Sequence, residues 1–319
     1  MLMSEHPPFF SVIIPTCCRP ERLTVCLARL FPDVQSLPQV EFEIIVTDDS
    51  PNAATRQLVV HDFPSVIWTK GPERGPAANR NHGARCAQGK WLLFLDDDCI
   101  PSDEWLKGYK TKIESTNAQL IEGKTVCTGM TNHPFEERVA NTSGGVFWSC
   151  NLAVEKEKFL HSGGFDEDFQ EPASEDMEFS TRLVRQGILT AFAEGPSVEH
   201  PARLLNWQQL WKRALMIRWF SLYCLKTGRN LSGNPLRIIA SLVMEHSLNL
   251  VRTNWRTVQK GPSEFHRALF LLGWNTLTFP ILLPYLIYWH MRFRNALLRK
   301  NASLSVGVAS AGLEQTVYS

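Results

Sequence analysis

Short apolar runs and amphipathic stretches alternate through the first hundred residues of the chain. The apolar runs that predict β-strands cover residues 9–14, 42–47, 65–68 and 91–95. Amphipathic stretches that begin near Pro20 and Gly75 predict helices that lie between these strands. Pro is favoured in a first helical turn. Strands that alternate with helices favour a parallel sheet with right-handed crossovers. The pattern therefore predicts an α/β unit.

The pattern continues to about residue 202 and then changes. Residues 144–151 and 189–194 are predicted strands, residues 155–159 a short helix, and Ser174 the N-cap of a helix that begins at Glu175. Beyond residue 202, apolar and basic residues predict helices over 207–225 and 236–251. We therefore expect a domain over residues 1–202, with halves 1–101 and 102–202, and a helical region over residues 203–319.

Three acids stand at the end of the most apolar predicted strand. Residues 91–95 form an uninterrupted apolar run, and Asp96, Asp97 and Asp98 follow at once. Ligand sites in open α/β sheets lie outside the carboxyl ends of the strands. Three adjacent carboxylates repel one another unless a cation lies among them, and Mg²⁺ or Mn²⁺ suits such oxygen ligands. An acidic surface turn is the alternative, and the preceding buried strand argues against it.

Charge is divided unevenly along the chain. Residues 1–200 carry 18 Lys and Arg against 29 Asp and Glu, a net charge of −11. Residues 201–319 carry 15 against 3, a net charge of +12. A basic region favours a phosphate-bearing or anionic partner, and its richness in Trp, Leu and Ile favours a membrane surface over nucleic acid.

The cysteines and the N-terminus bear on the compartment. The eight cysteines form no CxxC pair and no metal-ligand spacing, which indicates buried small side chains in a reducing compartment. Neither a basic n-region nor an apolar h-region precedes the first predicted strand. We expect the catalytic part to lie in the cytosol.

Six short motifs occur in a fixed order between about residues 10 and 200. They are Ile14-Pro15-Thr16-x-x-Arg19, Asp48-Asp49-Ser50, Gly75-x-x-x-Asn79-Arg80-Asn81-x-Gly83, Leu95-Asp96-Asp97-Asp98, Gly163-Gly164-Phe165-Asp166-Glu167 and Glu175-Asp176-Met177-Glu178. Each motif alone is weak, but the ordered set resembles the family 2 glycosyltransferases of GT-A fold. That resemblance implies a mainly parallel mixed sheet flanked by helices, an NDP-sugar donor, Mg²⁺ or Mn²⁺, and inversion at the anomeric carbon.

The resemblance also implies roles for individual residues. The residues that would contact the nucleotide sugar are Pro15, Thr16, Arg19, Asp48, Asp49, Arg80, Asp96 and Asp97. Asp96 and Asp98 correspond to the family's Asp-x-Asp element, with Asp98 and Asp96 as metal ligands. Asp-Asp-Ser stands where Asp-Asp-Gly is commoner, which departs from the usual loop. For Arg19 and Arg80, a surface salt bridge is the alternative.

An inverting transfer needs one carboxylate to accept the proton of the acceptor hydroxyl. By position in the family, Asp176 would be this base and Glu175 its neighbour at the acceptor. The alternative is that both acids only favour the N-terminus of their helix. His200 falls where several GT-A enzymes supply a further metal ligand, although a lone His is more often structural.

The C-terminal region contains a long uncharged segment. Residues 268–290 run for 23 residues without Lys, Arg, Asp or Glu, and basic residues follow. About 20 apolar residues cross a bilayer, so this segment is predicted to be a transmembrane or, because of its prolines, a re-entrant helix. A packing helix is the alternative. The family's processive Gln-x-x-Arg-Trp element is absent near residue 208, which favours transfer of a single sugar.

Three functions remain open at this stage. The first is a glycosyltransferase at the cytoplasmic face of a membrane, acting on a lipid-linked or surface-polysaccharide acceptor. The second is a nucleotidyltransferase on a sugar phosphate, which the acids at 175 and 176 disfavour. The third is a non-catalytic nucleotide-sugar binding module, which the complete set of acids disfavours.

Overall fold

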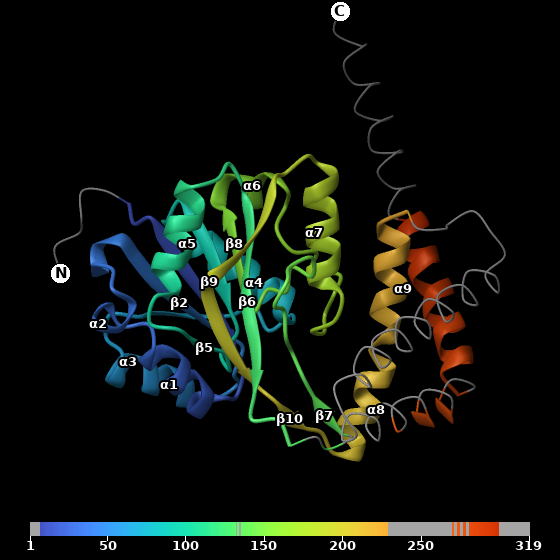
Figure 1. Cartoon of the computed structure of the whole chain (residues 1–319). Helices are drawn as coiled ribbons and strands as arrows, with labels where there is room; N and C mark the ends of the chain where they lie inside the picture. The colour runs from blue at the N-terminus through green and yellow to red at the C-terminus, as the bar shows by residue number, and fades with distance from the viewer. Residues whose placement is uncertain are drawn as a thin grey trace, which may run out of the picture. The chain divides into compact units, whose positions relative to one another are not determined.

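The computed structural model describes residues 7–131, 133, 135–228, 270, 273–274, 277–278 and 281–299 (Figure 1). The chain divides into two compact units, Met1–Asn206 and Trp207–Ser319.

A mixed sheet of eight strands forms the centre of the first unit. Its strand order is β3-β2-β1-β4-β8-β6-β9-β5. The strands are β1 (Phe10–Thr16), β2 (Phe42–Asp48), β3 (Ile67–Lys70), β4 (Trp91–Leu95), β5 (Ile100–Pro101), β6 (Leu120–Thr128), β8 (Asn151–Glu155) and β9 (Thr190–Pro201). A separate ribbon pairs β7 (Glu136–Glu137) with β10 (Arg203–Leu204).

Helices cover both faces of this sheet. They are α1 (Pro20–Ala28), α2 (Pro32–Gln35), α3 (Ala54–Asp62), α4 (Pro76–Cys86), α5 (Trp105–Glu114), α6 (Lys156–His161) and α7 (Glu175–Arg185), with a 3₁₀ turn, η1 (Gln39–Glu41). Side chains of α1, α3 and α5 share one apolar core with alternate strand residues such as Val12 and Leu93. Side chains of α4, α6 and α7 share the other with Ile13 and Phe94. The mixed, helix-flanked sheet fits a GT-A fold, as expected.

The four predicted strands of the first half, β1 to β4, are parallel, as the sequence predicts. β1 pairs with β2 from Phe10↔Phe42 to Thr16↔Asp48, and with β4 from Phe10↔Trp91. All five residues of β4 are buried, which confirms the predicted two-faced burial. The third strand begins two residues later than predicted, because Ile67 and not Ser65 starts the pairing with β2.

The second half departs further from the prediction. Residues 144–150 form a loop instead of the predicted strand, and β8 begins only at Asn151. Positive φ angles at Gly144, Gly145 and Phe147 (80°, 94° and 53°) bring this segment into the left-handed region, which strands do not use. β6 was not predicted at all, because Glu122, Gly123 and Lys124 interrupt its apolar pattern.

The second unit is helical where it is described. The predicted helix over 207–225 is two helices, α8 (Trp207–Leu215) and α9 (Ile217–Lys226), and residues 281–299 form a further helix. The predicted helix over 236–251 lies outside the described residues, as does part of segment 268–290. Among the residues that the structure describes, no helix has both the length and the apolar character that crossing a membrane requires. The predicted transmembrane segment is therefore unconfirmed.

Candidate active site

The predicted site residues gather along one edge of the sheet. β1, β2 and β4 run parallel and end there, at Thr16, Asp48 and Leu95. β8 runs antiparallel to β4, and its first residue, Asn151, pairs with Leu95. The acids after β4 and the loop before β8 therefore reach the same edge.

The loop after β2 is held by its own acids. Asp48 is buried, and its carboxylate accepts hydrogen bonds from the backbone N–H of Ser50 at 2.8 Å and from Trp68 Nε1 at 3.2 Å. Asp49 accepts a bond from the backbone N–H of Glu73 at 2.8 Å, and partial burial raises its pKa. Asp48 thus shapes this loop, and a nucleobase would have to share oxygens that are already bonded.

The three acids after β4 have different sets of partners. Asp96 Oδ1 lies 2.8 Å from Arg80 Nη2. Asp97 accepts a bond of 2.7 Å from the hydroxyl of Thr16 and pairs with Arg19 at 2.9 Å. Their pKa values diverge accordingly. Burial raises the pKa of Asp97 to about 7, whereas for Asp96 the charge and hydrogen bond of Arg80 outweigh burial and lower the pKa.

Asp98 lies among three arginine side chains and beside a histidine. One oxygen, Oδ2, contacts Arg22 at 3.1 Å, Arg19 at 3.3 Å and also Arg203 Nη2. The other, Oδ1, is shielded from solvent, takes no hydrogen bond from the part of the chain that is described, and lies 3.6 Å from His200 Nε2. The sequence did not single out Arg22 or Arg203, although Arg22 stands one helical turn after Arg19.

Asp98 and His200 fit a divalent cation. His200 Nδ1 lies 3.3 Å from the carbonyl oxygen of Pro201, which can only accept, so Nδ1 carries the proton and Nε2 presents a lone pair. A lone pair facing a carboxylate oxygen is a donor set that Mn²⁺ or Mg²⁺ can use. Cys99 lies in the same cluster, but its hydrogen bond to Cys150 and its burial raise its pKa and keep it a thiol. Asp96, which the sequence also proposed as a ligand, points to Arg80 instead.

The first turn of α7 brings two more acids to this edge. Ser174 holds the predicted N-cap position, but with a φ of 69° it makes no side-chain capping bond. Buried Glu175 pairs with Arg80 Nη1 at 3.2 Å, and burial together with the charge of Asp176 raises its pKa to about 8. Asp176 Oδ2 accepts a bond of 3.2 Å from the backbone N–H of Ser149, and burial raises its pKa. Asp176 Oδ1 takes no hydrogen bond from any described residue.

Arg80 joins the two halves of the site. It is buried on α4 and contacts Asp96 from one half and Glu175 from the other. Although burial opposes its charge, Asp96, Asp176 and Glu175 raise its pKa. The sequence placed Arg80 at the nucleotide, and here its guanidinium holds the acids of both halves together.

A buried carboxylate that the sequence missed holds the loop before β8. Glu122 on β6 accepts hydrogen bonds from the backbone N–H of Val146 at 3.1 Å, from that of Phe147 at 2.9 Å, and from that of Gly145. It also accepts a bond of 2.9 Å from Asn141 Nδ2. This loop leads directly to Ser149 and so to Asp176. A Glu beside Gly123 in an otherwise apolar stretch was the available signal.

Comparison with known proteins identifies the domain that carries this site. Residues 11–167 match the sequence model of glycosyl transferase family 2. The chain is 26% identical over 218 residues to the glycosyltransferase AglE of Haloferax volcanii, covering 63% of this chain and 69% of AglE. It is 28% identical over 182 residues to a GalNAc(5)-diNAcBac-PP-undecaprenol β-1,3-glucosyltransferase of Campylobacter jejuni, covering 54% of this chain and 55% of that enzyme.

A solved structure supports the fold. The mannosyltransferase PcManGT from Pyrobaculum calidifontis, in complex with GDP-Man and Mn²⁺, superposes with a TM-score of 0.55. The match covers 92% of this chain and 87% of PcManGT, at 15% identity. At that identity the likeness concerns the fold alone.

Proposed function

We propose, from the premise that this chain carries a family 2 glycosyltransferase domain, that it moves a single sugar from an NDP-sugar to a lipid-linked or cell-surface polysaccharide acceptor. The transfer would be metal-dependent and would invert the anomeric carbon, with Asp176 as general base. The family assignment favours this function over a nucleotidyltransferase or a non-catalytic binding module.

The observation that carries the proposal is the hydrogen bonding of the two carboxylate oxygens of Asp176. Its Oδ2 is fixed by the backbone N–H of Ser149, whereas Oδ1 takes no hydrogen bond from the described residues. A carboxylate with one oxygen held and the other without a hydrogen bond has a lone pair left to receive the proton of an acceptor hydroxyl. Burial raises the pKa of Asp176, which increases its basicity once it is ionised.

The neighbours of Asp176 suit this role. Glu175 pairs with Arg80, and burial together with the negative charge of Asp176 raises its pKa. Arg80 supplies positive charge that helps Asp176 to ionise. A single base is sufficient for a direct displacement at the anomeric carbon.

Positive charge would bind the diphosphate of the donor, from a divalent cation and from arginine side chains. Asp98 and His200 would hold a divalent cation, and when bound it would neutralise charge on the departing diphosphate. Arg19 and Arg22, both partly exposed, lie beside Asp98 and can contact phosphate oxygens. The relation to a transferase that acts on an undecaprenol-linked glycan supports a lipid-linked acceptor.

The experiment that tests this function measures donor hydrolysis and sugar transfer with a panel of NDP-sugars, with and without Mn²⁺. Asp176→Asn should lower kcat by about 10²–10⁴-fold while the Kd of the nucleotide stays nearly unchanged, because only proton removal is lost. Glu178→Gln, on the same helix but bonded to Arg182, is the matched control and should retain activity. If Asp176→Asn instead weakened nucleotide binding and spared transfer, Asp176 would not be the base.

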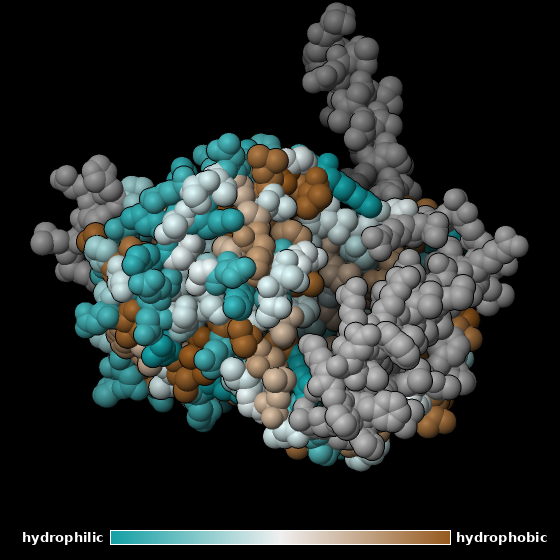
Figure 2. Space-filling model, in the orientation of Figure 1, coloured by the Kyte–Doolittle hydropathy of each residue, from teal (hydrophilic) through white to brown (hydrophobic). Residues whose placement is uncertain are grey.

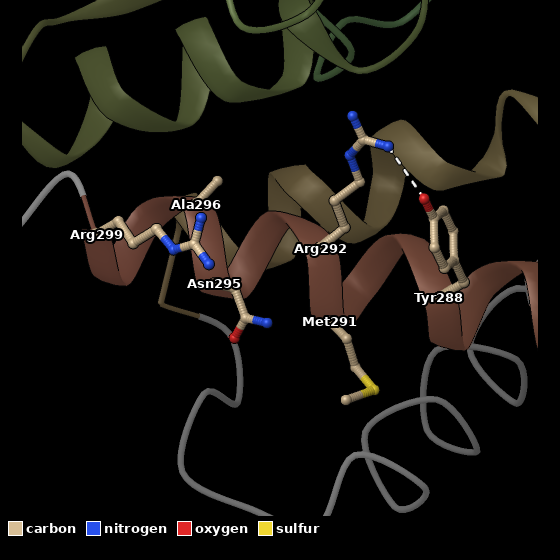
Figure 3. A pocket seen from close by; sticks show the side chains of 6 residues that line it. All are labelled: Tyr288, Met291, Arg292, Asn295, Ala296 and Arg299. Carbon is tan, nitrogen blue, oxygen red and sulfur yellow. Dashed lines mark hydrogen bonds between the residues drawn. The ribbon is translucent and has the colours of Figure 1, made fainter.

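We extend the proposal to attachment at the cytoplasmic face of a membrane. On the helix over residues 281–299, Arg292 and Arg299 line an open pocket together with Tyr288 and Met291 (Figure 3). The net charge of +12 over residues 201–319 points the same way. Each basic residue near an anionic leaflet contributes roughly 1 kcal/mol. The visible face of the first unit differs from this basic region, because hydrophilic and hydrophobic residues are interspersed over it (Figure 2).

Flotation with vesicles tests this attachment. The full chain should bind vesicles that contain anionic lipid and should bind neutral vesicles less. Arg292→Gln combined with Arg299→Gln should reduce binding, and each lost charge should cost roughly 1 kcal/mol. Equal binding of both proteins to both kinds of vesicle would contradict the electrostatic part of the proposal.

A further inference from the structure

Arg203 lies outside the residues that match the family model, and the proposed function gives it no role. It lies on β10, three residues after His200, and pairs in register with Glu137 of β7. Its Nη2 contacts Asp98 Oδ2 and lies 3.2 Å from His200 Nε2, and its Nη1 lies 3.8 Å from Glu137 Oε2. About a quarter of the Arg203 side chain is exposed, which leaves it a path outward.

The contact between Arg203 and His200 has only one chemical form. A guanidinium donates and cannot accept, so His200 Nε2 must be the acceptor. This is the same lone pair that a divalent cation would use. One lone pair cannot serve an N–H group and a metal ion together, so a cation that binds Asp98 and His200 must displace Arg203.

The displaced guanidinium needs a new partner. Arg19, Arg22 and Arg203 share one oxygen of Asp98. A cation that takes this carboxylate leaves an excess of positive charge beside it, which repels the cation and attracts an anion. A diphosphate provides such an anion, and Arg binds phosphate oxygens with two parallel hydrogen bonds.

We propose that Arg203 is a positioning residue that competes with the divalent cation and makes its binding conditional on a nucleoside diphosphate. Without the diphosphate, Arg203 stays on Asp98 and His200 and weakens cation binding. With it, Arg203 moves to the phosphates and both ligands bind more tightly, because such coupling is reciprocal. The inference rests on the metal dependence in the proposed function.

The test measures the affinity of the full chain for Mn²⁺ by calorimetry, with and without UDP, and again with GDP. Chelation of Mn²⁺ by the free nucleotide is the same for every variant, so it cancels when variants are compared. In Arg203→Gln, Mn²⁺ alone should bind about tenfold tighter than in the wild type, which is about 1.4 kcal/mol. UDP or GDP should then increase the affinity much less than in the wild type.

Two variants control this measurement. Arg22→Gln removes a guanidinium from the same oxygen of Asp98 but does not touch His200, so its effect should be clearly smaller than that of Arg203→Gln. Asp98→Asn should abolish specific Mn²⁺ binding. A second measurement needs no variant: in ¹⁵N-labelled wild-type protein, the Arg203 side-chain resonance should shift when Mg²⁺ and UDP are added together.

The outcomes separate this inference from the function on which it rests. If Arg203→Gln left the same Mn²⁺ affinity and nucleotide coupling as the wild type, or changed them no more than Arg22→Gln does, the role of Arg203 would be wrong and metal-dependent transfer would stand. An Arg203 resonance that did not respond to Mg²⁺ and UDP would overturn it as well. If neither wild type nor variant bound Mn²⁺ even with nucleotide, the metal dependence itself would fail.

Discussion

The two halves of the catalytic unit hold their site residues by different means. In the first half, the acids at 48 and 96–98 follow directly from the ends of the parallel strands β2 and β4. In the second half, the loop over 144–150 has no strand to fix it, and Glu122 binds its backbone N–H groups instead. Strand ends position residues through a ladder of many bonds, whereas three successive N–H groups of this loop, at residues 145–147, share one buried carboxylate. Substitutions in the two halves should therefore destabilise the protein in different ways.

The largest effect is expected where the halves meet. Arg80→Gln would leave Asp96 and Glu175 without their buried cation, and breaking a buried pair costs about 3–5 kcal/mol of unfolding free energy. Arg19→Gln is the matched control, because Arg19 also contacts two acids but is 38% exposed, so water screens its pairs and their loss should cost less than that of Arg80. Urea denaturation measures the unfolding free energy that each variant loses. Equal losses in the two variants would mean that the burial of the Arg side chain does not determine the cost.

The cost of losing Arg80 should also depend on pH. Arg80 lowers the pKa of Asp96, so its stabilising effect is fully present above the ordinary value of 3.8 and is lost as the pH falls through the lowered value. The gap in stability between wild type and Arg80→Gln should therefore narrow below about pH 4. A gap that stayed constant into acid would show that Arg80 stabilises by packing and not by charge.

A smaller effect is expected at the loop of the second half. Glu122→Gln would turn an NH₂ group toward backbone donors and cost about 1–3 kcal/mol. The matched control is Glu43→Gln in the first half, where Glu43 accepts bonds from Ser11 Oγ and the backbone N–H of Gln88 but is more exposed. Amide hydrogen exchange at residues 145–147 should accelerate in the first variant only. Faster exchange at these amides in both variants would mean general destabilisation.

The sequence predicted the first half well because its signals are local. An apolar run, a following acid and a Pro near a helix start are each contained within a few residues, and β1, β2 and β4 were all found. The second half was predicted poorly because its structure depends on distant partners. Residues 144–151 looked apolar enough for a strand, and the partner that binds the backbone of this loop, Glu122, stands more than twenty residues earlier.

The same distinction applies to the site. Asp98 and His200 were both proposed as metal ligands, and the structure brings them to 3.6 Å. Their proximity follows from the pairing of β9 with β5, in which Glu199 lies opposite Ile100, and no local pattern indicates that pairing. Arg203 and Arg22 were missed, because an Arg at a strand or helix surface has no signal of its own. The directions of Asp96 and Arg80 were likewise out of reach, since they arise from side-chain packing across two helices and a strand.

The reversal of chain direction between β4 and β8 has a consequence for how such a protein can diversify. Five residue pairs, from Trp91↔Glu155 to Leu95↔Asn151, join the two strands inside the sheet. The segments that extend from this pair at the site edge belong to different parts of the chain, one after β4 and one before β8. Insertions or substitutions in the segment before β8 can therefore accumulate while the acids after β4 keep their place. We expect such a scaffold to admit new acceptors while the acids after β4 stay unchanged.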